Sequence, residues 1–105
     1  MFQVLIALAD GEKHGYAVIK EVARRTNGEI TLSAATLYTI IRRFVQDGVI
    51  VETAERPDPA LDDERRRYYR LTEFGRRVAK ADAARMEAAL GMARAKKLIP
   101  KGRLT

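Results

Sequence analysis

Hydroxyl and guanidinium side chains recur along residues 33–43, and their spacing indicates what they could bind. The candidate set is Ser33, Thr36, Tyr38, Thr39, Arg42 and Arg43. A guanidinium can donate two hydrogen bonds to a guanine edge, whereas threonine suits phosphates or a thymine methyl group. Such residues in the first turns of a helix can enter a major groove. The alternative is a solvated helix face, and for Tyr38 packing against the preceding helix stays open beside a phosphate contact.

Tyr16 stands near the predicted start of another helix and is a second candidate for phosphate binding. Free backbone amides and the helix dipole favour an anion at that position. Lys13 and Lys20 flank Tyr16 as candidate contacts to a nucleic-acid backbone. A core position is the alternative for the tyrosine ring.

Three consecutive arginines, Arg65, Arg66 and Arg67, lie near the tip of a predicted hairpin. Arginine at such a tip is attracted to narrow, electronegative stretches of a minor groove. Three acidic residues precede them and could neutralise the cluster: Asp62, Asp63 and Glu64. Because strand residues alternate between faces, we expect Arg66 and Arg67 to point to opposite faces of the strand.

Enzyme chemistry has little support in these residue types. The chain has no cysteine, and His14 is its single histidine, which excludes thiolate metal sites and a histidine cluster. No nucleophile–base pair or phosphate-cradling glycine loop is evident. We therefore expect neither an enzyme nor a bound metal or cofactor.

Length and charge fit a small nucleic-acid-binding protein. The 105 residues suit one domain, and 20 basic against 14 acidic residues give a net charge of +6, which favours polyanions. The apolar run at residues 2–9 is too short to span a membrane, and no basic segment precedes it. We expect a cytoplasmic, nucleoid-associated protein without a membrane partner.

Periodicity and turn residues predict the elements that position these side chains. Helices are expected at residues 2–9, 15–26 and 34–47, with Ser33 as an N-cap and a short strand at 30–32. Strands at residues 49–55 and 68–71 enclose a polar, proline-containing loop. A last helix, capped by Thr72, runs to about residue 97. The chain is thus mainly α (α+β), with the element order of a winged helix-turn-helix.

The last helix carries a seam that predicts a helical partner. Its small and apolar residues recur in steps of four and three, at Ala79, Ala83, Met86, Leu90 and Ala93. This is the heptad pattern of a coiled coil, so we expect a homodimer. Phe74 and Val78 are expected to face the domain, and Phe2 and Leu5 to contribute to the dimer contact.

This pattern divides the chain into three parts. Residues 1–71 form the expected DNA-binding domain, residues 72–99 the dimerisation helix, and residues 100–105 a flexible tail. A helix that folds back on its own domain is the alternative to a dimer, but about 26 residues at ~1.5 Å each exceed what so small a domain can cover.

Three segments resemble the PadR family of bacterial transcriptional regulators. They are HGYAVIKEV at residues 14–22, LSAATLYTIIRRFVQDGVI at 32–50 and RRYYRLTEFGR at 66–76, and the resemblance extends from about residue 4 to 92. Where the family usually has Pro-Gly before Thr-Leu-Tyr, this chain has Ala34-Ala35. Alanine is a good helix former, so we expect the helix and the fold to be retained. The resemblance makes His14 a structural turn residue and suggests the smaller subclass without an additional C-terminal domain.

The function implied is that of a sequence-specific repressor which binds a palindromic operator in double-stranded DNA as a homodimer. Release by a small-molecule effector would fit the family, although the chain has no tryptophan and no aromatic residue after Phe74, which disfavours stacking of a planar ligand there. The alternative is a winged-helix module whose basic face contacts an acidic protein.

Overall fold

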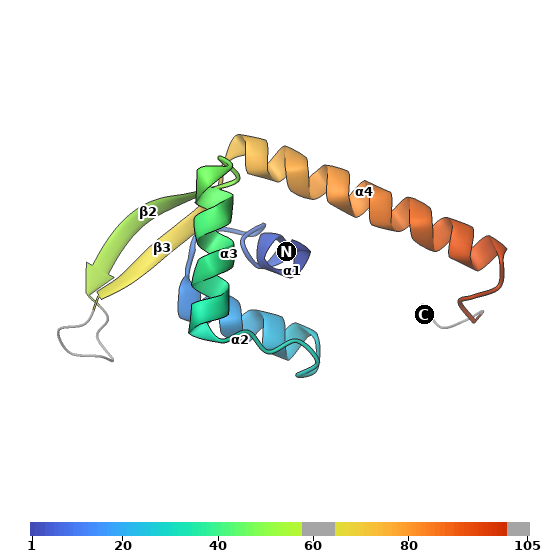
Figure 1. Ribbon diagram of the computed structural model, residues 1–105, viewed down its shortest axis with the longest axis horizontal. Helices are drawn as coiled ribbons and strands as arrows, with labels where there is room; N and C mark the ends of the chain where they lie inside the picture. Colours follow the sequence, from blue (N-terminus) through green and yellow to red (C-terminus); the bar gives the residue numbers. More distant parts are fainter. Residues whose placement is uncertain (58–64, 101–105) are drawn as a thin grey trace.

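The computed structural model of the protein describes residues 1–57 and 65–100. Over these residues the chain forms α1 (Phe2–Ala7), β1 (Lys13–His14), α2 (Gly15–Arg25), α3 (Ala34–Gln46), β2 (Ile50–Pro57), β3 (Arg65–Leu71) and α4 (Glu73–Ala95). The first three helices pack together, the β2–β3 hairpin projects from one side, and α4 extends from the other (Figure 1). This is the α+β winged-helix arrangement that the sequence predicted.

The sheet joins the hairpin to the beginning of α2. Its strand order is β1-β3-β2, and both pairings are antiparallel. The pairing of His14 with Tyr68 ties β1 to the central strand, while Ile50 pairs with Leu71 at the base of the hairpin. An irregularity between Glu52 and Ala54 interrupts the hairpin register, and a bulge of this kind bends and twists a strand.

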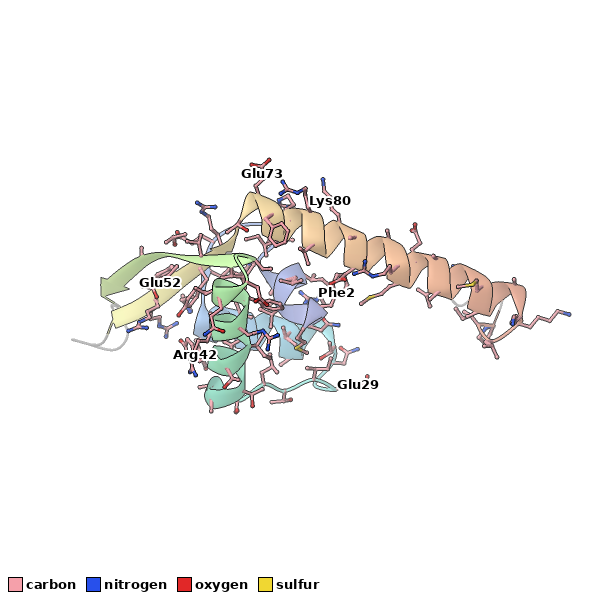
Figure 2. The ribbon with its side chains drawn as sticks, turned by 45° about the horizontal axis from the view of Figure 1, so that its top comes forward. Phe2, Glu29, Arg42, Glu52, Glu73 and Lys80 are labelled. Atoms are coloured by element: carbon pink, nitrogen blue, oxygen red, sulfur yellow. The ribbon has the colours of Figure 1, made fainter. Side chains whose placement is uncertain are left out.

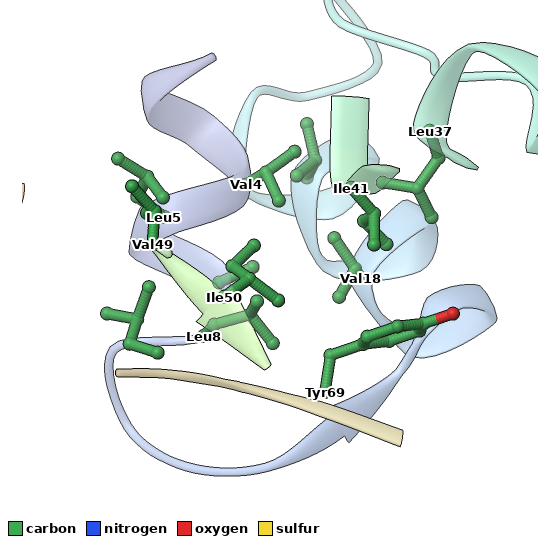
Figure 3. Close-up of a cluster of buried hydrophobic side chains, with 12 residues drawn as sticks. Val4, Leu5, Leu8, Val18, Leu37, Ile41, Val49, Ile50 and Tyr69 are labelled. Carbon is green, nitrogen blue, oxygen red and sulfur yellow. The ribbon is translucent and has the colours of Figure 1, made fainter. Parts of the chain in front are cut away.

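A single cluster of buried apolar residues holds α1, α2, α3 and the sheet together (Figure 3). Leu37 and Ile41 on α3 are buried, with Ile40 and Phe44 packed against the cluster, as the helical period predicted. Leu5 is only 1% exposed within this core. Our expectation that Leu5 contacts a partner subunit was therefore wrong, because its side chain has no accessible surface to offer.

Side-chain caps define where three of the helices begin. The hydroxyl groups of Ser33 and Thr72 accept hydrogen bonds from the amides of Thr36 and Gly75, which confirms both predicted caps. His14 caps α2 through its imidazole ring. Each cap satisfies an amide that lacks a partner in the first turn of its helix.

The beginning of α4 is pressed tightly against the body of the domain. An ideal Cβ at Gly75 would lie 2.0 Å from the carbonyl oxygen of Val49, so only glycine allows this approach. Val78 packs against the core as expected, but Phe74 is 47% exposed and does not face the domain. Phe74 instead lies beneath the guanidinium of Arg77, 5.7 Å from the ring centre.

The structure corrects several other expectations. Residues 30–32 form no strand, and the two-residue strand β1 was not predicted. Helix α4 ends at Ala95, two residues early. The predicted hairpin loop falls largely at residues 58–64, and most of the predicted tail at residues 101–105; both ranges lie outside the described residues. None of the described helices combines the length and apolar character needed to cross a membrane.

Candidate functional site

A cleft of about 880 Å³ lies between α3, the start of α2 and the hairpin. Its wall consists of His14, Gly15, Tyr16, Tyr38, Ile41, Arg42, Val45, Glu52, Arg66, Arg67 and Tyr69. Figure 2 shows Arg42 on α3 and Glu52 on β2 toward the same side of the molecule, where helix and hairpin meet. Three arginines and three tyrosines around a partly apolar floor can bind a large, flat or rod-shaped polyanion.

Tyr38 is fixed by close packing against α2. A Cβ at Gly15 would lie 2.7 Å from the Tyr38 hydroxyl oxygen, so the absence of a side chain at Gly15 makes room for the phenol. The Tyr38 ring also lies 6.5 Å from the ring of Tyr69, centre to centre. With 37% of Tyr38 exposed, both roles considered from the sequence, packing and surface contact, are compatible with its position.

Tyr69 forms the bottom of the cleft and belongs to the core, being 4% exposed. Burial raises the pKa of its hydroxyl above the ordinary value, and the nearby Tyr38 and Glu52 act in the same direction. Tyr69 is therefore a neutral phenol at physiological pH, and it adds no negative charge to a basic surface.

The outward face of α3 carries the predicted hydroxyl and guanidinium groups. Ser33, Thr36, Thr39, Arg42 and Arg43 are all exposed. Arg43 pairs with Asp47 one turn later at 3.3 Å, whereas Arg42 makes no ion pair within the described part of the chain. The Thr39 hydroxyl donates to the carbonyl of Ala35 at 3.0 Å, which fixes its rotamer and leaves its methyl group available.

Tyr16 lies at the surface, 53% exposed, so the core position considered for it is excluded. Its ring is accompanied by two cations, with the Lys20 ammonium 5.3 Å and the Arg66 guanidinium 5.2 Å from the ring centre. The structure thus brings residues 16, 20 and 66 together at the start of α2. Such cation–π contacts hold the side chains in place while leaving their polar groups accessible.

Lys13 has a different position from the other predicted contacts. Its ammonium donates to the carbonyl of Ala7 at 2.7 Å and pairs with Asp10 and, at 3.6 Å, with Glu21. Only 20% of the side chain is exposed. Lys13 therefore ties the α1–α2 connection together, and we leave it out of the proposed contact surface.

The arginines of β3 reach the cleft from two faces. We expected strand alternation to send Arg66 and Arg67 to opposite faces of β3. Both arginines nevertheless line the cleft. Arg67 lies 4.0 Å from the carboxylate of Glu52 on the paired strand. Arg65 pairs with Pro57 in the backbone register, but its side chain lies outside the described residues.

A second exposed surface lies on the outer half of α4, which Figure 2 shows standing clear of the body. Within the predicted seam, Ala79 is partly buried against the core, whereas Met86 and Leu90 are 46% and 47% exposed. Ala83 is exposed and Ala93 partly buried. Phe2, also predicted at the dimer contact, packs partly against the core.

Sequence reasoning missed that Glu52, Tyr69 and His14 line the cleft. A strand residue reveals its neighbours only when the register is known, and the irregularity after Glu52 shifts that register. Strand alternation in β3 was the available signal for Tyr69, because it places Tyr69 on the same face of the strand as the candidate residue Arg67.

Comparison with known proteins identifies relatives of this architecture. Residues 4–81 match the Transcriptional regulator PadR-like family. An uncharacterised protein from Lysinibacillus sphaericus is 32% identical over 73 residues, which are 70% of this chain and 64% of that protein. The chain therefore matches just under two thirds of that relative's length.

Two solved structures share the fold. A PadR family transcriptional regulator from Eggerthella lenta DSM 2243 superimposes with a TM-score of 0.69 at 27% identity, covering 93% of this chain and 82% of the other. Bacillus subtilis PadR, solved in complex with operator DNA, gives a TM-score of 0.65 at 16% identity, covering 76% of this chain and 44% of that one.

Proposed function

The chain belongs to the PadR-like family of transcriptional regulators, and from this premise we propose that it is a sequence-specific DNA-binding repressor. Members of the family are transcriptional regulators and not enzymes. We propose further that it acts as a homodimer on a palindromic operator. The Bacillus subtilis relative was solved with operator DNA, which supports a DNA-binding use of this fold.

The observation that carries the proposal is the common position of three arginines on one cleft. Arg42 comes from α3, while Arg66 and Arg67 come from the hairpin, and all three line the same wall. A helix in the major groove and a hairpin beside it require their cations on one side of the domain. We assign Arg42 and the α3 threonines to base edges, and Tyr16, Tyr38, Lys20 and the hairpin arginines to the DNA backbone.

The exposed seam of α4 supports the dimer. In a helix of 23 residues, Met86 and Leu90 leave about half of their surface in water, and a second copy of α4 would cover them. A two-fold dimer would present two α3 helices to successive turns of a duplex, about 34 Å apart. The operator would then be an inverted repeat with half-sites spaced by roughly 10 base pairs.

We also propose that binding of a small-molecule effector releases the protein from DNA, and we assign no site to this effector. The sequence has no aromatic residue after Phe74, so the outer half of α4 offers no ring on which a planar effector could stack. Met86 and Met92 provide a deformable apolar surface instead.

A binding titration separates this function from its competitor, a winged-helix module that contacts an acidic protein. Fluorescence anisotropy would follow a labelled duplex from the region upstream of the protein's own coding sequence and a shuffled duplex of equal composition. We expect tighter binding to the upstream duplex and a steep loss of affinity between about 50 and 200 mM salt. Equal affinity for both duplexes, or a flat salt response, would contradict the proposal.

A further inference from the structure

His14 makes two contacts at once, and only one of them concerns the helix that it caps. Its Nδ1 atom accepts a hydrogen bond from the amide of Ala17 at 3.1 Å, which starts α2. An accepting nitrogen carries no proton, so in the capping form of the ring the Nδ1 lone pair is directed at the amide of Ala17.

The second contact is with the hairpin. One terminal nitrogen of the Arg66 guanidinium lies 3.0 Å from Nδ1 and 2.9 Å from Nε2 of His14. A nitrogen almost equally close to both ring atoms rests against the imidazole ring and not on the lone pair of one atom. The same guanidinium lies 5.2 Å from the centre of the Tyr16 ring, so Arg66 contacts two rings that belong to the start of α2.

The imidazole ring is itself held in position from the sheet. Backbone pairing sets His14 opposite Tyr68, and the two rings meet edge to face, 5.4 Å apart at an angle of 89°. The cap, the strand pairing and the tyrosine together define one ring orientation, and that orientation presents the ring to Arg66.

Capping alone does not explain a histidine at this position. Serine, threonine, aspartate and asparagine are the preferred N-caps, and this chain uses a hydroxyl residue at both other side-chain caps among the described helices. None of these shorter side chains provides a ring for the guanidinium. The extra size of histidine therefore serves the contact with Arg66.

We propose that His14 is a positioning residue for DNA binding, which holds the Arg66 guanidinium of the hairpin beside Tyr16 and the first turn of α2. This inference rests on the proposed DNA-binding function. It implies that the hairpin and α2 contact one phosphate of the bound duplex together. In the free protein, His14 already holds these two elements in the relative position that this contact requires.

The test is a double-mutant cycle with His14→Asn and Arg66→Ala, measured on a duplex selected for tight binding. Asparagine preserves the N-cap, so we expect the free protein to stay folded, with its thermal midpoint lowered by only a few degrees through loss of the ring contact with Tyr68. We expect Arg66→Ala to weaken binding about 10-fold and His14→Asn about 5-fold, within the range for loss of a phosphate contact. The double variant should bind no more weakly than Arg66→Ala alone, because His14 acts through Arg66.

The salt dependence supplies a readout that a purely structural role would not change. Loss of one phosphate contact lowers the slope of log affinity against log salt by about 1, so His14→Asn should shift this slope toward that of Arg66→Ala. Losses that multiply in the double variant, or a wild-type slope for His14→Asn, would overturn the role of His14. Failure of the wild-type protein to prefer any duplex would instead reject the proposed function itself.

Discussion

The cleft beside α3 and the outer half of α4 are both exposed, but they present opposite chemistry. The cleft displays Arg42, Arg66 and Arg67 around tyrosine rings, whereas α4 displays Met86 and Leu90 among alanines. Exposed cations are well solvated and attract a polyanion. Exposed apolar side chains arranged along a seam favour a matching apolar surface. Equal exposure therefore favours two different partners, which we propose are DNA for the cleft and a second copy of the chain for α4.

The two surfaces are also anchored differently. Side-chain contacts organise the cleft, with Gly15 against Tyr38 and His14 against Arg66. Backbone packing at Gly75 sets the direction of α4, and its outer turns touch little of the domain. A charge placed on the seam should therefore act on assembly, and on DNA binding only through loss of the second α3 helix, whereas changes in the cleft should affect DNA binding and leave assembly intact.

Leu90→Glu should have the largest effect of the substitutions considered, because it places a charge on the exposed apolar seam of α4. In a two-fold dimer it would place two carboxylates in an apolar seam, and like charges brought together cost several kcal/mol. We expect the dimer dissociation constant to rise by roughly 1,000-fold, with a folded monomer remaining. Sedimentation equilibrium measures the constant. Ala88→Glu, on the opposite side of α4, is the matched control and should leave assembly intact.

Gly75→Ala tests how α4 is anchored. The new methyl group would meet the Val49 carbonyl oxygen at 2.0 Å, so the helix must shift, and we expect a loss of about 3 kcal/mol in the free energy of unfolding. Urea titration followed by circular dichroism measures it. Gly91→Ala on the same helix meets no neighbouring atom and should stabilise by about 1 kcal/mol. Equal effects at both positions would show that the close approach at Gly75 is absent.

Arg42→Ala tests whether the cleft residue Arg42 contacts a base edge. We expect a loss of about 1–3 kcal/mol in binding free energy and relaxed base preference at one operator position, because Arg42 is assigned to a base edge. Competition titrations with single-base operator variants measure both effects. Arg43→Ala, whose side chain already pairs with Asp47, is the control and should lose less. An equal loss on every sequence would remove Arg42 from base reading.

Glu52→Gln should have the smallest effect, in the opposite direction. The Glu52 carboxylate lies 4.0 Å from Arg67 and places negative charge on a surface proposed to meet phosphates. Its removal should tighten binding to all duplexes by about 2- to 5-fold, since the pair is exposed and worth about 1 kcal/mol or less. Titrations at fixed salt measure this change. Weaker binding would mean that Glu52 positions Arg67 and does not compete for it.

Elements defined by local sequence were predictable from the chain. The apolar period of α3 and the caps at Ser33 and Thr72 depend on residues within one or two helical turns, and the structure has them as predicted. The winged-helix order followed from these elements together with two β-branched or aromatic strands.

Features that depend on distant residues were not predictable in this way. The strand β1 exists only because β3 pairs with it, and Glu52 enters the cleft only through the hairpin register. Leu5 and Phe74 were misplaced for the same reason: an apolar residue indicates burial, but the tertiary packing decides which surface covers it. The contact of His14 with Arg66 spans 52 positions and has no local signature.

Selection of bound duplexes from a random pool, at fixed salt and with the wild-type protein, would decide whether the operator is an inverted repeat that two α3 helices contact. We predict enrichment of an inverted repeat whose half-sites are centred about 10 base pairs apart, with Leu90→Glu abolishing the repeat. Enrichment of a single unrepeated site, or of no sequence at all, would contradict a dimer that presents two α3 helices to successive turns of one duplex.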